Sequence, residues 1–476
     1  MSETARKIAI IGSGFLGLTL ALRLAETGVK VTVYESASEI GGLASAWQIG
    51  DVVWDKHYHV TLLSDAYTRK IVEEIGLGDE FEWVETKTGF YTDGKLVSMS
   101  NTLEFLQFPP LDLISKFRLG ATIFYASRVK EWKALEKISV EDWLTKFSGK
   151  RTFEKMWKPL LKAKLGEAYK ETSAAFIWAT IQRMYAARNS GLKREMFGYV
   201  RGGYARVLEK FGEHLREKGV EIRLNEKVER IEKPNDGIIE IFPAKAQRRE
   251  EEEIYSQINT DAHRLKIGGE NIAVAEMIAK NQKPKTKNQF DSVILTCPST
   301  LAAKICPQLT ETEKTKLENI KYQGIVCASV LMKKSLSDFY VTNITDETPF
   351  TGIIEMSALV DKREFEGNAL VYLPKYVAPN DELFDKTDAE IEEIFLSALE
   401  KMYPHFSRED VKAFKVSRVR QVFPLPTLNY SANVPNVKTS LENVFIVNSS
   451  QITNGTLNVN ETVMLAEKFF ENYLQK

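Results

Sequence analysis

The N-terminal residues follow the hydrophobic pattern of a strand, a helix and a second strand. Residues 7–11 form a short apolar run, residues 18–25 carry apolar side chains suited to a buried helix, and residues 29–34 form a second, β-branched run after Gly28. This order predicts a βαβ unit, in which the two strands lie parallel and are joined by a right-handed crossover. We therefore expect an α/β fold around a parallel sheet.

Later patterns predict further helices and strands. Residues 103–194 are rich in helical spacing and interleave aromatic with basic side chains, which indicates a separate helical lobe. Strand-like runs then return, and the last of them precedes a helical stretch. The expected strands span residues 220–231, 291–296, 325–331 within a mixed block at 324–372, and 444–447, and the expected helices span 388–402 and 458–473.

The composition is that of a soluble globular chain. Its 476 residues are 43% hydrophobic and 27% charged, which is enough for large cores in two or three domains. The 64 basic and 65 acidic residues give a net charge of −1, so bulk charge favours neither nucleic acid nor an anionic membrane. We expect a small-molecule substrate and no nucleic-acid partner.

The cysteines and the N-terminus indicate a reducing compartment. Cys297, Cys306 and Cys327 are too few for a disulfide framework and form no Cys-x-x-Cys pair. Residues 1–7 are polar and lead directly into the first strand, without the pattern of a secretion signal. No apolar run approaches the roughly 18 residues that span a bilayer. We expect a cytoplasmic protein without a transmembrane segment, with peripheral membrane contact left open.

Residues 244–287 interrupt the strand-like pattern with a strongly charged stretch. It contains a run of glutamates at 250–253 and a lysine-rich run at 280–287. Such a composition is typical of a solvated surface segment, because it offers little apolar area to bury. We interpret this stretch as an insertion into the domain around it.

Gly12, Gly14 and Gly17 form a Gly-x-Gly-x-x-Gly pattern between the first strand and the helix. The pattern alone is weak, but in this context Gly12 permits a tight turn, Gly14 the close approach of a pyrophosphate, and Gly17 close packing of helix on strand. Phe15 and Leu16 stand at the helix start, where free N–H groups and the helix dipole face the phosphates. The segment predicts a dinucleotide site.

Glu35 ends the second strand at the position where such sites carry an acidic residue. A carboxylate there can accept hydrogen bonds from the adenosine ribose and would repel a 2′-phosphate, which argues against NADP. Gly41 and Gly42 then allow another backbone stretch to lie against the nucleotide. A second contact of this kind suits a long, extended cofactor and favours FAD.

On these residues, the segment from residue 8 to about residue 59 resembles the flavoprotein superfamily that contains protoporphyrinogen oxidase, phytoene desaturases, amine oxidases and UDP-galactopyranose mutase. The resemblance implies FAD as the cofactor. It also implies a Rossmann-like, GR2-type FAD-binding domain with a mixed α+β substrate domain and a helical lobe. Later segments that extend the resemblance are Gly202-Gly203-Tyr204 with the following helix, Val228, and residues 291–298, 442–448 and 455–461.

The resemblance also implies a division of the chain and a set of FAD contacts. The expected FAD-binding domain combines residues 1–85, 196–300 and 426–476, with a helical lobe at 90–195 and a substrate domain at 301–425. The residues implied for FAD binding are Gly12, Gly14, Phe15, Leu16, Gly17, Glu35, Ser36, Gly41, Gly42, Leu43, Ala44, His59, Val228, Pro298, Asn448 and Asn458.

Two positions depart from the superfamily pattern. Members often have Gly-Asp after the last strand, with the aspartate near the ribityl chain, whereas this chain has Asn448-Ser449. An amide can still hydrogen-bond a hydroxyl or a phosphate, but without charge. Amine oxidases usually carry arginine after the second glycine pair, where this chain has Leu43. The chain is therefore more similar to the desaturase and mutase branches.

Three residues are candidates for chemistry beside the flavin. His59 matches a histidine that desaturases and mutases place beside the isoalloxazine ring, so it is either a flavin contact or proton relay, or a structural histidine. Lys164, in a Lys-x-Gly segment similar to one near the mutase diphosphate, and Arg183 are either substrate anion contacts or ordinary surface cations. The other histidines have no ligand-like spacing, and we expect no metal site.

Residues 103–125 form an unusually aromatic and apolar pair of helical stretches. In membrane-associated relatives a comparable region admits lipophilic substrates. The alternative is a helical lobe that packs on its neighbour.

The resemblance leads to three functional hypotheses. The first is an FAD-dependent oxidoreductase of the desaturase or oxidase type, which removes a hydride from an organic substrate to flavin N5. The second is a redox-neutral mutase acting on a sugar nucleotide, which Lys164 and Arg183 favour and the aromatic segment opposes. The third is a non-enzymatic FAD-binding protein.

Overall fold

A five-stranded parallel sheet forms the centre of one half of the fold. The structure is a computed structural model that describes residues 5–188, 196–234, 237–244 and 288–475. The strand order is β10-β2-β1-β14-β20, and every neighbouring pair is parallel. Strands from distant parts of the chain thus lie side by side: β1 Lys7–Ile11, β2 Lys30–Tyr34, β10 Glu221–Arg223, β14 Ser292–Leu295 and β20 Val444–Ile446.

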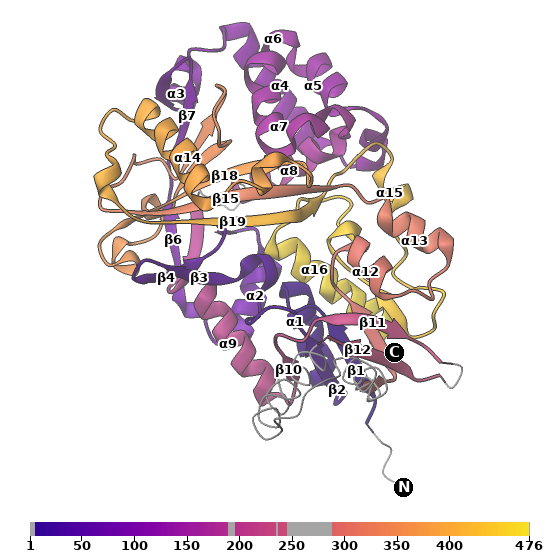
Figure 1. The fold of residues 1–476 in the computed structure, drawn as a ribbon. Helices are drawn as coiled ribbons and strands as arrows, with labels where there is room; N and C mark the ends of the chain where they lie inside the picture. The colour runs from indigo at the N-terminus through magenta and orange to yellow at the C-terminus, as the bar shows by residue number, and fades with distance from the viewer. Residues whose placement is uncertain (1–4, 189–195, 235–236, 245–287, 476) are drawn as a thin grey trace, which may run out of the picture.

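The two faces of this sheet are covered by different layers, which explains its nearly continuous apolar strands. In β1, Ile8 and Ile10 face one hydrophobic cluster, and Ala9 and Ile11 face another. The first cluster contains helices and the second a small sheet with two helices (Figure 1). The helices of the first layer are α1 Phe15–Glu26, α2 Ala66–Glu74, α9 Gly203–Glu217 and α16 Val459–Phe469; the second layer holds α12 Ser299–Ile305, α13 Glu311–Glu318 and the sheet β11 Val228–Glu232, β12 Ile239–Pro243 and β13 Asn288–Phe290.

A second, seven-stranded sheet carries the other half of the fold, in the order β19-β15-β18-β17-β16-β7-β8. Its longest interior strand, β15, is buried over its whole length. Val326 and Ala328 face α14 Asp388–Met402, whereas Ile325 and Cys327 face the cluster that includes the helical region. The strands are β7 Thr88–Thr92, β8 Lys95–Ser98, β15 Tyr322–Met332, β16 Val341–Ile344, β17 Gly352–Glu355, β18 Ala369–Val377 and β19 Val411–Pro424.

Short helices form the end of the molecule opposite both chain termini (Figure 1). These helices confirm the predicted helix-rich stretch from residue 103 as far as Arg188. Residues 189–194 of the predicted stretch lie outside the described residues. The strands β7 and β8 precede these helices, so the beginning of the predicted helical lobe, residues 90–98, contains strands of the second sheet. The domain limits stay predictions. The helices are α3 Thr102–Gln107, α4 Leu113–Arg128, α5 Val140–Ser148, α6 Lys150–Thr152, α7 Lys158–Leu165 and α8 Ala174–Arg188.

Most of the strands and helices expected from the sequence are present. β1, β14, β15, α14 and β20 confirm the corresponding predictions, and α1 begins at Phe15 rather than at residue 18. The C-terminal helix ends at Phe469 and continues as a π-helical turn, Phe470–Leu474. Two small antiparallel sheets were not predicted: β3 Ala46–Ile49 with β4 Val52–Asp55, and β5 Thr61–Leu62 with β9 Met196–Val200 and β6 Phe81–Glu85. Residues 245–287 of the charged insertion lie outside the described residues.

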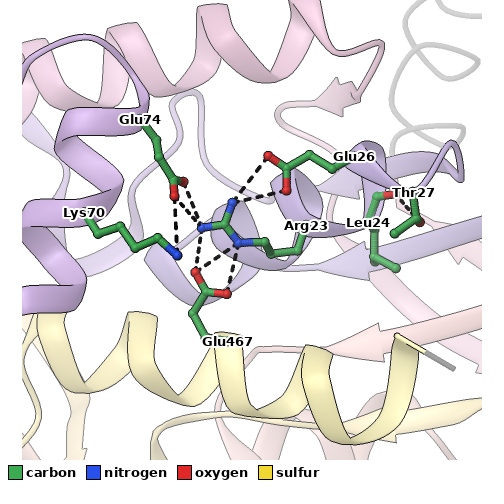
Figure 2. Close-up of polar contacts among 7 residues, drawn as sticks. All are labelled: Arg23, Leu24, Glu26, Thr27, Lys70, Glu74 and Glu467. Carbon is green, nitrogen blue, oxygen red and sulfur yellow. Dashed lines mark hydrogen bonds and ion pairs between the residues drawn. The ribbon is translucent and has the colours of Figure 1, made fainter.

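A buried ion-pair network holds α1 against the C-terminal helix (Figure 2). Arg23 Nε lies 3.0 Å from both carboxylate oxygens of Glu467, and Arg23 Nη2 lies 2.6 Å from Glu467 Oε1, although the two residues are 444 apart in the chain. The same guanidinium binds Glu74 Oε2 at 2.8 Å and Glu26 Oε2 at 3.2 Å. These contacts raise the pKa of Arg23 against the opposing effect of burial. The network joins α1, α2 and α16.

Replacing Arg23 by methionine should strongly destabilise the protein. Glu467, which is only 8% exposed, would lose its partner while staying buried, and breaking such a pair costs about 3–5 kcal/mol. The double variant R23M/E467L should recover most of this loss, because the carboxylates that still lose Arg23, those of Glu26 and Glu74, are open to solvent. Urea unfolding, followed at its first transition, measures the effect. As a control, R206M breaks the more exposed pair with Glu80 and should cost about 1 kcal/mol or less. Equal stabilities of R23M and R206M would refute this account.

Candidate functional site

The turn between β1 and α1 requires glycine for steric reasons. Gly12 has φ +112°, and a Cβ there would lie 2.7 Å from the Thr296 side-chain oxygen. A Cβ at Gly17 would lie 2.1 Å from the Gly12 carbonyl oxygen, which is part of the backbone and unable to move aside. Gly12 and Gly17 therefore allow strand and helix to pack as closely as the sequence pattern predicts.

The first turn of α1 offers backbone N–H groups to a ligand. Gly14 is the N-cap, and no side chain accepts a hydrogen bond from the turn. A Cβ at Gly14 would meet no protein atom within 4 Å. The side chains of Phe15 and Leu16 are buried in the hydrophobic cluster, so their contribution toward a cofactor would come from backbone N–H groups. Free N–H groups and the helix dipole together favour an anion such as a pyrophosphate.

The second glycine pair lies directly against this turn. Gly41 has φ +115° and donates its N–H to the Ser13 carbonyl at 2.9 Å, and Gly14 and Gly41 form an isolated parallel bridge. A Cβ at Gly42 would lie 3.4 Å from Gly14 Cα. Leu43 and Ala44 continue the chain into a short 3₁₀ turn. The two glycine segments thus form one backbone-lined cradle at the carboxyl edge of the sheet.

Glu35 binds the first glycine turn from the end of β2. Its Oε2 accepts the Ser13 N–H at 3.0 Å and the Ser13 hydroxyl at 2.8 Å. Its Oε1 accepts the Ser36 hydroxyl at 3.1 Å and the Ala37 N–H at 2.9 Å. A carboxylate has about four lone-pair positions, so these contacts fix its orientation. Sequence reasoning missed the Ser13 contact, although Ser13 is part of the glycine pattern.

The C-terminal residues of the predicted site lie at the same edge of the sheet. Asn448 follows β20, is 2% exposed, and donates from Nδ2 to the Cys297 carbonyl at 2.9 Å, next to Pro298. Its amide thereby joins the ends of β14 and β20. Asn458 is the N-cap of α16 and accepts the Glu461 N–H at 3.0 Å. Val228 is buried at the start of β11, in the cluster that also contains Tyr34.

His59 lies beside a buried carboxylate at the start of α9. Asp55 Oδ1 accepts the Tyr204 N–H at 2.8 Å, and a Cβ at Gly203 would lie 3.0 Å from the same oxygen. His59 Nδ1 is 3.7 Å from Asp55 Oδ2, and its ring is 5.0 Å from that of Tyr204. Burial raises the pKa of Asp55. The Gly202-Gly203 turn therefore brings the helix start onto the Asp55 and His59 side chains.

Lys164 lies in an aromatic environment on the second sheet. Its Nζ is 2.6 Å from the Tyr376 hydroxyl, 3.9 Å from the Tyr376 ring centroid and 5.1 Å from the Phe423 ring centroid. The Tyr376 hydroxyl is also 3.0 Å from that of Tyr58. Beside Tyr58, His57 Nε2 lies 3.2 Å from the Ser417 hydroxyl, and burial lowers the His57 pKa to about 3.

Arg183 has a different set of partners from Lys164. Its Nη2 binds Asp65 Oδ2 at 2.9 Å, and that oxygen also accepts the Leu62 N–H at 2.9 Å. Glu461 is near enough for Arg183 and Asp65 to affect its pKa, which burial raises. The structure thus places the two predicted cations in separate polar clusters rather than in one anion site. Asp55, Tyr58 and Tyr376 were missed, because the chain around them gives no local signal.

The cradle fits an extended dinucleotide. The α1 turn follows β1, Glu35 follows β2 and the α16 start follows β20, at the carboxyl edge of one parallel sheet, where such folds bind nucleotides. Val228 begins β11 in the adjacent three-stranded sheet and is buried in the same cluster as Tyr34 of β2. FAD is long enough to extend along these positions. The roles of the individual residues stay predictions.

Gly17→Ala should weaken FAD retention, because its Cβ would force the helix away from the Gly12 carbonyl oxygen. Overpacking of this kind costs about 1–3 kcal/mol of stability. FAD released per mole of purified protein, together with the urea midpoint, measures both effects. The control is Gly120→Ala in α4, where a Cβ meets no atom within 4 Å, so alanine should stabilise the helix by about 1 kcal/mol. Equal FAD content in the two variants would contradict this view of the turn.

Comparison with known proteins gives matches to flavoenzymes. The chain is 25% identical over 259 residues to zeta-carotene desaturase from Synechocystis sp., covering 48% of this chain and 52% of that enzyme. It is 19% identical over 437 residues to 15-cis-phytoene desaturase from Arabidopsis thaliana, covering 87% and 70%. For several of the curated relatives, the matched part of the chain spans about half of the relative's length.

Solved structures agree on the fold. An oxidoreductase from Methanosarcina mazei superimposes with a TM-score of 0.71 at 15% identity, covering 98% of this chain and 100% of that one. A family model described as flavin containing amine oxidoreductase matches residues 17–248 and 257–456, which are nearly the whole chain. The chain therefore belongs to the flavin-containing amine oxidoreductase family, which implies FAD as its cofactor.

Proposed function

We propose that this protein removes a hydride from a carbon of an organic substrate, in the manner of a desaturase or an oxidase. The observation that carries this proposal is the double-glycine cradle, in which Gly14 and Gly41 form a bridge at the carboxyl edge of the parallel sheet. FAD bound there would supply the electron chemistry, accepting the hydride at N5. The protein would position the substrate, exclude water and hold protons.

In this proposal each segment of the site has a role. The first turn of α1 holds the pyrophosphate, Glu35 the adenosine ribose, and Val228 the adenine through its backbone. The start of α16 at Asn458 faces the pyrimidine ring. His59 would contact the flavin beside Asp55, whose Oδ2 lies 3.7 Å from His59 Nδ1.

The matches favour this oxidoreductase over the sugar-nucleotide mutase. The mutase hypothesis was favoured by Lys164 and Arg183 as candidate anion contacts. Arg183 is engaged by Asp65 at 2.9 Å, and Lys164 lies in an aromatic environment. A non-enzymatic role is disfavoured by membership of a family of oxidoreductases.

An apolar patch on α3 and α4 supports a lipophilic substrate taken from a membrane surface. Leu113, Ile114 and Phe117 are 73%, 74% and 77% exposed, which is unusual for residues of this size. Among the described residues, no helix has the length and apolarity needed to cross a membrane. We therefore propose peripheral contact, with the helix lying in the interface. The patch consists of Leu103, Leu106, Leu113, Ile114, Phe117, Phe124 and Tyr125.

Basic side chains border this patch. Arg128 stacks on the Phe124 ring at 4.3 Å, and Arg118 donates to the Lys146 carbonyl at 3.1 Å. Arg118, Arg128 and Lys146 are exposed. Cations around an apolar surface favour the anionic headgroups of a cytoplasmic leaflet. The cysteines, all free and buried, are compatible with the cytoplasmic location we propose.

The purified protein should be yellow and should be bleached by a reduced substrate under anaerobic conditions. Polyenes, porphyrinogens, amines and UDP-hexoses form the test panel, and visible absorption is the measurement. We expect stoichiometric bleaching by at least one compound of the first three classes. Absence of flavin after denaturation would refute the proposal. Isomerisation of a UDP-hexose without net oxidation would select the mutase instead.

The double variant I114D/F117D should lose binding to vesicles of phosphatidylcholine and phosphatidylglycerol by more than tenfold. Burying each of these side chains is worth about 1.5–3 kcal/mol, and aspartate removes that gain. Flotation measures the bound fraction, with pure phosphatidylcholine and high salt as comparisons. As a matched control, I394D/L428D changes two exposed apolar residues elsewhere, which are 37% and 41% exposed, and should bind like the wild type. Equal binding by both variants would exclude the patch as the contact.

A further inference from the structure

Lys164 differs from the lysines around it in having an aromatic rather than an acidic partner. Lys158 binds Glu154 at 2.8 Å, and Lys162 and Lys170 both bind Glu167 at 2.7 Å. Lys164 is on the same helix as Lys158 and Lys162, one residue from its C-terminal end, but faces the second sheet. Within the described residues its contacts are the Tyr376 hydroxyl and the rings of Tyr376 and Phe423.

Burial without a carboxylate partner lowers the pKa of Lys164 to about 7. Desolvation penalises the ammonium form, and nothing charged compensates for it. Among the described residues, the groups with a raised pKa on this side of the sheet include Tyr58, Tyr340, Tyr372, Tyr376 and Cys327, and burial is the cause for each. These groups are therefore uncharged near neutral pH. An amine in such surroundings can lose and regain a proton under physiological conditions.

A line of hydrogen-bonded groups runs from this amine to Tyr58, the residue next to the predicted flavin contact His59. Tyr376 Oη lies 2.6 Å from Lys164 Nζ and 3.0 Å from Tyr58 Oη. Tyr58 stands directly before His59 in the chain, and its ring is 6.2 Å from that of Tyr372, whose hydroxyl donates to the Asp55 carbonyl at 2.5 Å. Protonated phenols both donate and accept, so this arrangement can pass a proton along its hydrogen bonds.

We propose that Tyr58, Tyr376 and Lys164 form a proton relay that takes up the proton released when the substrate is oxidised. This inference rests on the function proposed above. Oxidation of a C–H bond with an adjacent C–H, N–H or O–H removes one hydride and one proton. The hydride goes to the flavin, the proton passes to Tyr58 as Tyr58 gives its own to Tyr376, and Tyr376 protonates the free amine of Lys164. Lys164 later returns the proton to water.

The first test needs no substrate. An unfolded lysine has a pKa of about 10.4, so between pH 7 and pH 10 the unfolded chain binds a proton at Lys164 that the folded chain does not. Wild-type stability should therefore rise with pH in this range relative to K164M. The ratio of their unfolding equilibrium constants in urea should change by about tenfold per pH unit between pH 7.5 and 9.5. K170M, at an exposed and paired lysine, should show no such change relative to the wild type. A pH-independent ratio for K164M would overturn the relay, whatever the activity.

The second test uses the panel compound that bleaches the wild-type flavin. Its anaerobic bleaching rate should rise with pH through an apparent pKa near 7. K164R, which keeps the charge but cannot release a proton at these pH values, should lose this rise and be at least tenfold slower at pH 8. Y376F and Y58F should also lose the rise, and K170R should behave as the wild type. A wild-type rate in K164R would instead assign Lys164 to binding an anionic group, and an unchanged Y58F would exclude the relay.

The two proposals fail in different ways. If no compound bleaches the wild-type flavin, the proposed oxidation is wrong, while the stability measurement still reports whether Lys164 is an unprotonated amine. If bleaching occurs but its rate is independent of pH in the wild type, the oxidation stands and the relay is refuted.

Discussion

The contact between Arg23 and Glu467 is the interaction on which the arrangement of the nucleotide site depends. α1 and α16 come from opposite ends of the chain, and both begin at the carboxyl edge of the parallel sheet. One buried guanidinium sets their relative position, because it binds Glu467 with two of its nitrogens. The starts of both helices would face one cofactor only if their far ends stay clamped in this way. An ion pair near the C-terminal ends of the two helices thus helps to hold their N-terminal ends in position.

The second constraint is the deep burial of the seven-stranded sheet, which excludes water from the groups that lie on it. β15 is buried along its entire length, and the aromatic side chains around it leave little room for water. Burial in this region shifts the pKa of basic side chains, and it lowers the pKa values of Lys164 and His57. The nucleotide domain supplies backbone geometry, whereas the second sheet supplies unusual acid–base properties. The chain passes repeatedly between the two, since β10 and β14 of the first sheet and later β20 stand on either side of β15 to β19 of the second.

The sequence predicted those features whose residues are close together in the chain. The strand, glycine turn and helix were found because Gly12, Gly17 and Glu35 follow a local spacing with a steric cause. Lys164 was selected by a short pattern, but its partner Tyr376 lies in an apolar strand with no distinguishing neighbour. The partners of Lys164 and Arg183 escaped prediction for the same reason, since Tyr376 and Asp65 are known as partners only from the fold. Long-range pairs of this kind depend on topology, which local patterns do not contain.

The position of β20 at the edge of the parallel sheet has a consequence for biosynthesis. β14 pairs with β20, which is translated long after β14. Until translation reaches β20, β14 presents an open strand edge, and until it reaches α16, α1 has no Glu467 to bind. A nascent chain can form its first βαβ unit early, but the complete cofactor cradle needs β20 and the start of α16. The edge of β14 therefore has to be kept from aggregating while the residues between β14 and β20 are being made.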